Sequence, residues 1–258
     1  MKFSLISQNE FLIITNRILK YPAHIAEKDY FLALTLKTIY ESDLKNRLVF
    51  KGGTALHHFY LPQYRFSEDL DFTSTDQKVT IEDVRKVFKN HSNFIIKKDY
   101  VSPITVKVEK LQYSGILAQP SSLKIDISNV KNLVLPVIER KYKNVWRLDV
   151  QAKVMDILEI CAEKLSATSG RIRYRDFYDI YLITQELKIK INDAVELLHK
   201  KNIEKPISKK LILKNWQVAK NTKIDDLDTI YLKKEITDQE IEKFLNSLHF
   251  KEIVVSRS

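Results

Sequence analysis

Several short stretches in the first part of the chain alternate apolar and polar residues, as half-buried β-strands do. The clearest example is the sequence SLKIDIS at residues 122–128. Ile125 and Ile127 share one face of this segment, and Asp126 lies on the other. The pattern predicts strands at 48–51, 69–73, 93–99, 104–112 and 122–128.

Apolar residues at spacings of three and four predict helices before, between and after these strands. Leu32, Leu36 and Ile39, for example, recur on one side of the second helix. After Trp146 we expect helices alone, which predicts a boundary near residues 140–150. We expect helices at 8–20, 25–41, 54–60, 80–90, 150–168, 174–186, 192–201, 206–219 and 236–250. The fold class is therefore α+β: a mixed sheet flanked by helices (1–145), followed by an all-helical bundle (146–258).

The charge balance narrows the classes of partner. The chain has 258 residues and a formal net charge of +10, which favours a polyanionic partner such as nucleic acid or serves solubility alone. Lysines concentrate in residues 200–223. That stretch is either a solvated face or a nucleic-acid surface, and both interpretations stay open.

Two further features of the composition bear on the compartment. A single cysteine, Cys161, excludes an intrachain disulfide and fits a reducing cytosol. The first twenty residues lack a cleavage site, and polar residues interrupt their apolar run. We therefore expect a cytoplasmic protein with neither a signal peptide nor a membrane span.

A Gly-Gly pair stands out because the whole chain has four glycines. Gly52 and Gly53 lie between the strand at 48–51 and a helix. Glycines let the backbone approach a phosphate closely, and a helix N-terminus offers free N–H groups. The Thr54 hydroxyl and the Lys51 ammonium are further candidate phosphate contacts. A plain turn gives the same pattern, so this signal is weak by itself.

Acidic residues on the strands that follow strengthen the indication that the Gly-Gly turn belongs to a phosphate-binding site. Asp69 and Asp71 are two positions apart, so their carboxylates share one face of a strand. Two such carboxylates repel each other unless a cation lies between them, and oxygen ligands of this kind suit Mg²⁺. Asp126 is a third acid on a half-buried strand. Each acid taken alone is an ordinary exposed strand position, but together with the glycine turn they indicate metal-dependent nucleotidyl transfer.

The stretch KGGTAL…RFSEDLDF resembles the nucleotidyltransferase-like AbiEii/AbiGii toxin family, within the polymerase-beta-like nucleotidyltransferase superfamily. Three later segments also resemble family motifs: residues 125–127 (IDI), 159–165 (EICAEKL) and 173–179 (RYRDFYD). The resemblance covers roughly residues 45 to 185. Its first block matches at Gly52, Gly53, Thr54, Leu56, Arg65, Ser67, Asp69, Leu70, Asp71 and Phe72.

This resemblance implies a set of site residues, with the helical part completing the active site. The acids of the strands would hold Mg²⁺ or Mn²⁺, and an NTP would be the substrate. Candidate catalytic residues are Asp69, Asp71, Asp126, Lys164 and Asp179, of which the first three are the metal ligands. Candidate nucleotide-binding residues are Lys51, Gly52, Gly53, Thr54, Arg65, Ser67, Lys164, Arg173 and Asp176.

Three of these assignments have a structural alternative. Lys164 lies at the edge of an apolar helix face, where it needs an anionic partner such as Asp179. It either contacts nucleotide phosphates or forms a semi-buried ion pair. Asp176 either serves the site or complements the helix dipole. Ser67 is either a strand-start serine or, as in some family members, a site of inhibitory phosphorylation.

The function implied is that of a toxin in a type IV-like toxin–antitoxin or phage-defence system. The enzyme would transfer NMP from an NTP to RNA, with the 3′ end of tRNA as the expected acceptor, and release pyrophosphate. Its antitoxin would come from a neighbouring gene. The alternatives are a non-catalytic nucleotide- or nucleic-acid-binding module, and a nucleotidyltransferase acting on a protein or a small molecule.

Overall fold

The computed structural model describes residues 5–75, 77–201, 203, 205–223 and 231–255, which fall into two compact units. Unit 1 comprises Met1–Phe59, Ser67–Lys131 and Val137–Val154. Unit 2 comprises Tyr60–Phe66, Asn132–Pro136 and Met155–Ser258. Both units are therefore assembled from separated segments of the chain. The predicted division into domains 1–145 and 146–258 stays a prediction.

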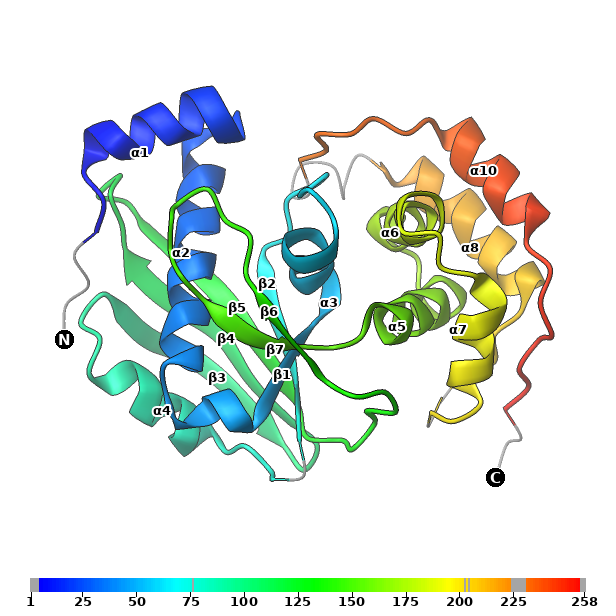
Figure 1. Cartoon of the computed structure of the whole chain (residues 1–258), viewed down its shortest axis with the longest axis horizontal. Coiled ribbons are helices and arrows are strands. Elements are labelled where there is room, and N and C mark those ends of the chain that lie inside the picture. Colours follow the sequence, from blue (N-terminus) through cyan, green and yellow to red (C-terminus); the bar gives the residue numbers. More distant parts are fainter. Residues whose placement is uncertain (1–4, 76, 202, 204, 224–230, 256–258) are drawn as a thin grey trace. The chain divides into compact units, whose positions relative to one another are not determined.

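Unit 1 is built on a seven-stranded mixed sheet with the strand order β3-β4-β5-β2-β1-β7-β6 (Figure 1). The pairs β1/β7 and β2/β5 are parallel, and the other neighbours are antiparallel. The strands are β1 (Leu48–Lys51), β2 (Asp69–Ser74), β3 (Phe94–Ser102), β4 (Thr105–Ser114), β5 (Pro120–Ser128), β6 (Ile138–Lys141) and β7 (Gln151–Val154). This mixed sheet confirms the predicted α+β class.

One face of the sheet is apolar and is covered by helix α2 (Ala23–Tyr40), as Figure 1 shows. Phe31 of α2 stacks on Tyr113 of β4 with ring centroids 3.9 Å apart, and Tyr40 packs near Phe72 of β2. The opposite face keeps the polar residues, because side chains alternate along each strand. The other helical segments of unit 1 are α1 (Gln8–Ile14), η1 (Thr15–Leu19), η2 (Asp43–Asn46), α3 (Gly52–Ala55), η3 (Leu56–Tyr60, whose last residue belongs to unit 2) and α4 (Ile81–Lys89).

Unit 2 is helical around a core centred on Trp216, which is fully buried. The rings of Tyr174 and Phe177 lie 5.7 and 5.4 Å from it. None of the helices in the described part of the chain is long and apolar enough to cross a membrane. The helices of unit 2 are α5 (Ile157–Gly170), α6 (Tyr174–Glu186), α7 (Ile191–Leu198), α8 (Lys209–Asn221) and α10 (Asp238–Ser247).

The structure corrects the sequence prediction at the end of unit 1. The helix expected at 150–168 begins only at Ile157, and Gln151–Val154 forms β7 instead. Val154 pairs with Phe50 of β1 on one side and with β6 on the other. The local apolar pattern fits either state, so non-local pairing decided it. The strand β6 was not predicted from the sequence either.

Candidate active site

Asp71 lies in a row of charged residues that crosses four neighbouring strands of unit 1. It is the register partner of Lys51 on β1 and of Asp126 on β5. Asp126 is in turn the partner of Lys107 on β4. Directly paired residues project from the same face of a sheet about 5 Å apart. The structure therefore brings two of the predicted acids side by side and flanks them with two lysines.

Lys107 was not predicted as a site residue. Its ammonium Nζ lies 2.7 Å from Oδ2 of Asp126, and both side chains are about two-fifths exposed. The hydrogen bond to Asp126 raises the pKa of Lys107, and the charges of Asp126 and Asp71 add to it against the opposing effect of burial. Lys107 thus supplies the positive charge that two neighbouring carboxylates need.

Gly52 shapes the space beside Asp71. Its φ of +78° lies in the left-handed region that favours glycine. A Cβ at this position would meet Oδ2 of Asp71 at 2.2 Å, far inside van der Waals contact. The turn and the carboxylate are therefore packed against each other, and only glycine fits there.

Thr54 ties the same turn to the start of β2. Its buried hydroxyl donates to the carbonyl oxygen of Asp69 at 2.6 Å and lies 3.3 Å from that of Ser67. The hydroxyl therefore serves backbone groups within unit 1. Gly53 is buried in the same turn, while Lys51 and Ser67 are half-buried.

Asp69 stands two positions before Asp71 and so projects from the same face. Its register partner on β5 is Lys124, which is exposed. No group of three or more His, Cys, Asp or Glu is arranged to hold a metal ion within the described ranges. The donor chemistry of Asp69, Asp71 and Asp126 nevertheless fits a hard divalent cation, because all three offer carboxylate oxygens.

Unit 2 contains a second cluster, made of two carboxylates and three cations. Asp179 accepts from Nε and Nη2 of Arg65, both at 2.7 Å. Lys164 lies 2.7 Å from Asp179 and 3.1 Å from Asp176. Arg171 completes the cluster with two hydrogen bonds to Asp176. The semi-buried Lys164–Asp179 pair that the sequence suggested is thus present.

Because most of these groups are buried, their charges depend on the opposite charges of their neighbours. Burial alone would raise the pKa of Asp176, but Lys164 and Arg171 outweigh it and lower that pKa below its usual range. Burial likewise opposes the charge of Arg65, and Asp179 more than compensates, raising the pKa of the guanidinium. The carboxylate of Asp176 is therefore held ionised.

The cations of this cluster differ in how far their side chains are exposed to solvent. The side chain of Arg65 is 1% exposed and that of Lys164 10% exposed. Arg65 also donates from Nη1 to the carbonyl oxygen of Phe66. Its burial and its three hydrogen bonds favour a structural role for Arg65. Arg173, another predicted nucleotide-binding residue, is instead exposed at the start of α6.

Glu159, in the segment EICAEKL, also has a structural role. Its buried carboxylate accepts from the backbone N–H groups of Val134 and Leu135, at 3.0 and 3.1 Å, and pairs with Lys201. It thus fastens the segment Asn132–Pro136 to α5 within unit 2.

Lys107 and Arg171 were not predicted from the sequence, and the reason is the same for both. The alternation in TVKVEKL does place Lys107 on a polar face, but its partner Asp126 is 19 residues away. Arg171 precedes α6 in an irregular segment that carries no pattern. Only the tertiary structure shows which acid each cation meets.

The mixed sheet of unit 1 thus carries carboxylates on two adjacent parallel strands, and one of them, Asp71, packs against a glycine turn. The family model described as "Nucleotidyl transferase AbiEii toxin, Type IV TA system" matches residues 35–252. The chain belongs to this family. It is therefore a nucleotidyltransferase toxin of a type IV toxin–antitoxin system, and membership implies an NTP substrate and an antitoxin.

Two solved structures share the fold. MenT4, nucleotidyltransferase toxin Rv2826c from Mycobacterium tuberculosis H37Rv, is 19% identical with a TM-score of 0.59, covering 93% of this chain and 90% of its own. JHP933 from Helicobacter pylori is 18% identical with a TM-score of 0.54, covering 84% of this chain and 89% of its own. No curated protein matches the chain.

Proposed function

We propose that the enzyme transfers NMP from an NTP to an RNA acceptor, the 3′ end of tRNA being the leading candidate, and releases pyrophosphate. The observation that supports this most is the pairing of Asp71 with Asp126 on adjacent parallel strands. That arrangement concentrates negative charge on one face of the sheet, where a substrate triphosphate requires a bridging cation.

Asp69, Asp71 and Asp126 would hold Mg²⁺ or Mn²⁺, which neutralises phosphate charge when bound. Gly52 allows the carboxylate of Asp71 to take its position, because a Cβ there would collide with it. Lys107 holds the carboxylate of Asp126 through its ion pair. Gly52 and Lys107 are therefore positioning residues.

Lys164 would contact the nucleotide phosphates, with Asp179 and Asp176 orienting its ammonium group. These proposed roles are supported by the two ion pairs that Lys164 forms with Asp176 and Asp179 in unit 2. Arg173, Lys51 and the Gly52–Gly53 turn are proposed as further nucleotide contacts. Ser67 is proposed as a contact or a regulatory phosphorylation site.

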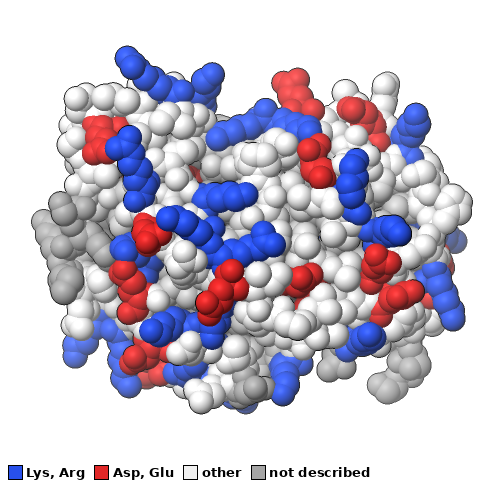
Figure 2. Space-filling model, viewed as in Figure 1, with Lys and Arg blue, Asp and Glu red and all other residues white. Residues whose placement is uncertain are grey.

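The acceptor is proposed to be RNA because the chain carries a net charge of +10. Over the face shown in Figure 2, however, lysines and arginines are interspersed with acids. The lysine-rich residues 200–223, of which 202 and 204 lie outside the described part, are a second proposed contact with RNA. An acceptor hydroxyl on a protein or a small molecule is the alternative.

Transfer of radiolabel tests this proposal. The wild-type protein is incubated with each α-labelled NTP, Mg²⁺ and total RNA, and we expect label on RNA. Asp71→Asn and Asp126→Asn should each lower transfer by about a hundredfold or more, because each removes one carboxylate charge from the reacting centre.

Asp99→Asn is the matched control, because Asp99 is an acid of the same sheet that pairs with Arg85 on α4. Its transfer rate should equal that of the wild type. Label on protein but not on RNA would select the alternative acceptor. Equal label from the wild type and both acid variants would contradict a role for this carboxylate pair.

A further inference from the structure

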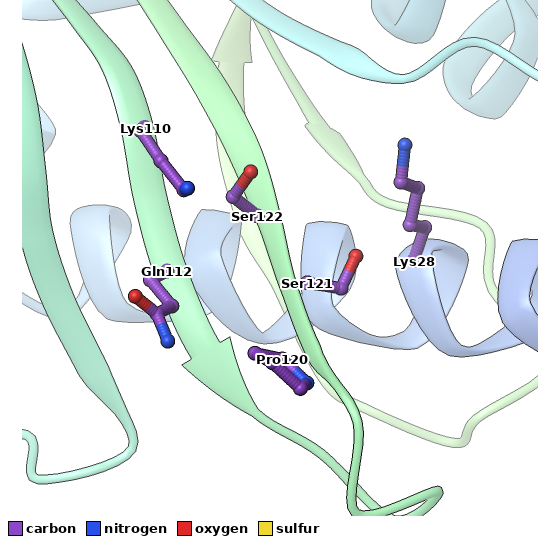
Figure 3. Close-up of a pocket in the computed structure, with 6 residues that line it drawn as sticks. All are labelled: Lys28, Lys110, Gln112, Pro120, Ser121 and Ser122. Carbon is purple, nitrogen blue, oxygen red and sulfur yellow. The ribbon is translucent and has the colours of Figure 1, made fainter.

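A polar pocket of about 440 Å³ lies in unit 1, and none of the predicted carboxylates lines it (Figure 3). Five of its six lining residues carry a side chain that can form hydrogen bonds. Two of these are lysines, and no acid lines the pocket. The lining residues are Lys28, Lys110, Gln112, Pro120, Ser121 and Ser122.

The pocket lies beside the first part of β5, which has a sheet neighbour on one side only. β4 pairs with this part, as Gln112 does with Ser122. β2 pairs only with residues Lys124 to Ser128 of β5, so within the described residues Pro120–Leu123 has no strand there. Figure 3 shows Lys28 of α2 beyond this open edge, with Lys110 on the other side of β5.

The same strand connects the pocket to the candidate active site. Asp126, Lys124 and Ser122 project from one face of β5, because the residues between them, Ile125 and Leu123, are buried. Ser122 and Asp126 are four positions apart, a span of roughly 13 Å at about 3.3 Å per residue. A stacked single strand, rising about 3.4 Å per nucleotide, covers that distance in roughly four nucleotides.

Two lysines along this line are available to a ligand. Lys110 and Lys124 are both exposed, and neither makes an ion pair in the described part of the chain. Lys28 differs, because it lies 3.0 Å from Glu68 and is partly neutralised. Lysine, serine and glutamine are side chains that commonly contact nucleic-acid phosphates.

We propose that this pocket binds a phosphodiester group of the RNA acceptor, a few nucleotides from the reacting 3′ end. Lys110, Gln112 and Ser122 contact that phosphate, and Lys124 contacts the strand between the pocket and Asp126. The proposal rests on the proposed function, because it assigns the place where that function's acceptor binds. It extends the acceptor site along β5.

RNA binding by the full-length protein tests this directly. The probe is a fluorescein-labelled single-stranded RNA of ten nucleotides, and its Kd is measured by anisotropy at several salt concentrations. The double variant Lys110→Ala/Lys124→Ala should raise Kd by about threefold or more at low salt. The slope of log K against log salt should become shallower by about 0.7 for each phosphate that the variant no longer neutralises.

Lys86→Ala/Lys89→Ala is the matched control. Both lysines are exposed on α4, whose Phe88 packs on Phe94 on the side of the sheet that α2 covers. The control should keep the wild-type Kd and slope. Thermal unfolding should give the same Tm for both double variants and the wild type, since all four side chains are exposed.

Two results would overturn the proposal. One is an RNA Kd and salt slope that are the same in the two double variants. The other is a rise in the Kd of NTP with no change for RNA, which would assign the pocket to the nucleotide. Both measurements report binding and need no turnover. A negative result would therefore contradict the RNA-binding pocket alone, whereas a lack of transfer onto RNA by the wild type would contradict the proposed function.

Discussion

At the scale of single residues, Gly52 shows how closely the backbone of the turn packs against the carboxylate of Asp71. Its positive φ and the approach of Asp71 each exclude a side chain. The glycine pair first indicated a flexible turn that could approach a phosphate. The structure shows that one of the two glycines also makes room for a carboxylate of the protein itself.

Substituting Gly52 tests this fit. Gly52→Ala should destabilise unit 1 by about 1–3 kcal/mol, because a left-handed φ and a displaced Asp71 both cost free energy. Transfer activity should fall with it, since Asp71 must move. Chemical denaturation measures the first effect and the labelled-NTP assay the second.

Gly170→Ala is the control for that substitution. A Cβ there would meet only the flexible side chain of Lys205, at 3.3 Å. We expect wild-type activity and a change in stability of less than about 0.5 kcal/mol. A Gly52→Ala protein as stable and active as Gly170→Ala would show that the close approach to Asp71 does not matter.

At the scale of elements, helix α4 is fixed at its N-terminus by a capping box. Thr80 accepts from the backbone N–H of Asp83, and the carboxylate of Asp83 accepts from the backbone N–H of Thr80. Arg47 adds an ion pair with Asp83 at 2.9 Å. Burial tends to raise the pKa of Asp83, but these hydrogen bonds lower it to about 2.

The lowered pKa predicts acid sensitivity with a definite sign. Asp83 stabilises the fold fully above its unfolded pKa of 3.8, and this contribution is lost as the pH falls towards 2. Asp83→Asn should therefore destabilise the protein by about 1–2 kcal/mol at pH 6 and by much less at pH 2. Urea unfolding at both pH values measures the difference, and an equal loss at both would contradict the assigned pKa.

At the scale of the whole molecule, unit 2 depends on an ion pair and on charge-assisted hydrogen bonds between distant segments. Arg65 joins the segment Tyr60–Phe66 to α6 through Asp179, and Glu159 joins Asn132–Pro136 to α5. Each tie is buried. Breaking a buried pair by removing one partner leaves an uncompensated charge, which costs more than losing an exposed pair.

Arg65→Met should accordingly destabilise the protein by about 3–5 kcal/mol, as expected when a buried pair loses one partner. Arg85→Met is the control, because Arg85 pairs with Asp99 on the surface of unit 1 and should contribute less than about 1 kcal/mol. Guanidinium unfolding measures both. Similar small losses for the two variants would mean that the Arg65–Asp179 pair does not hold unit 2 together.

Much of the fold and site followed from local patterns. Period-two alternation predicted the strands that carry Asp71 and Asp126, and the acids fell on their polar faces as expected. The motifs at 52–72, 125–127, 159–165 and 173–179 indicated the family that the family model then confirmed. These features depend on near neighbours in the chain, so the sequence by itself determined them.

The partners of these residues depended on the tertiary structure. Lys107 meets Asp126, Arg65 meets Asp179, and Gln151–Val154 becomes a strand because β1 and β6 lie beside it. Sequence periodicity states which face a side chain occupies but not which distant residue shares that face. Packing and pairing across the chain make that choice, because burying a charge or a backbone group requires a specific partner.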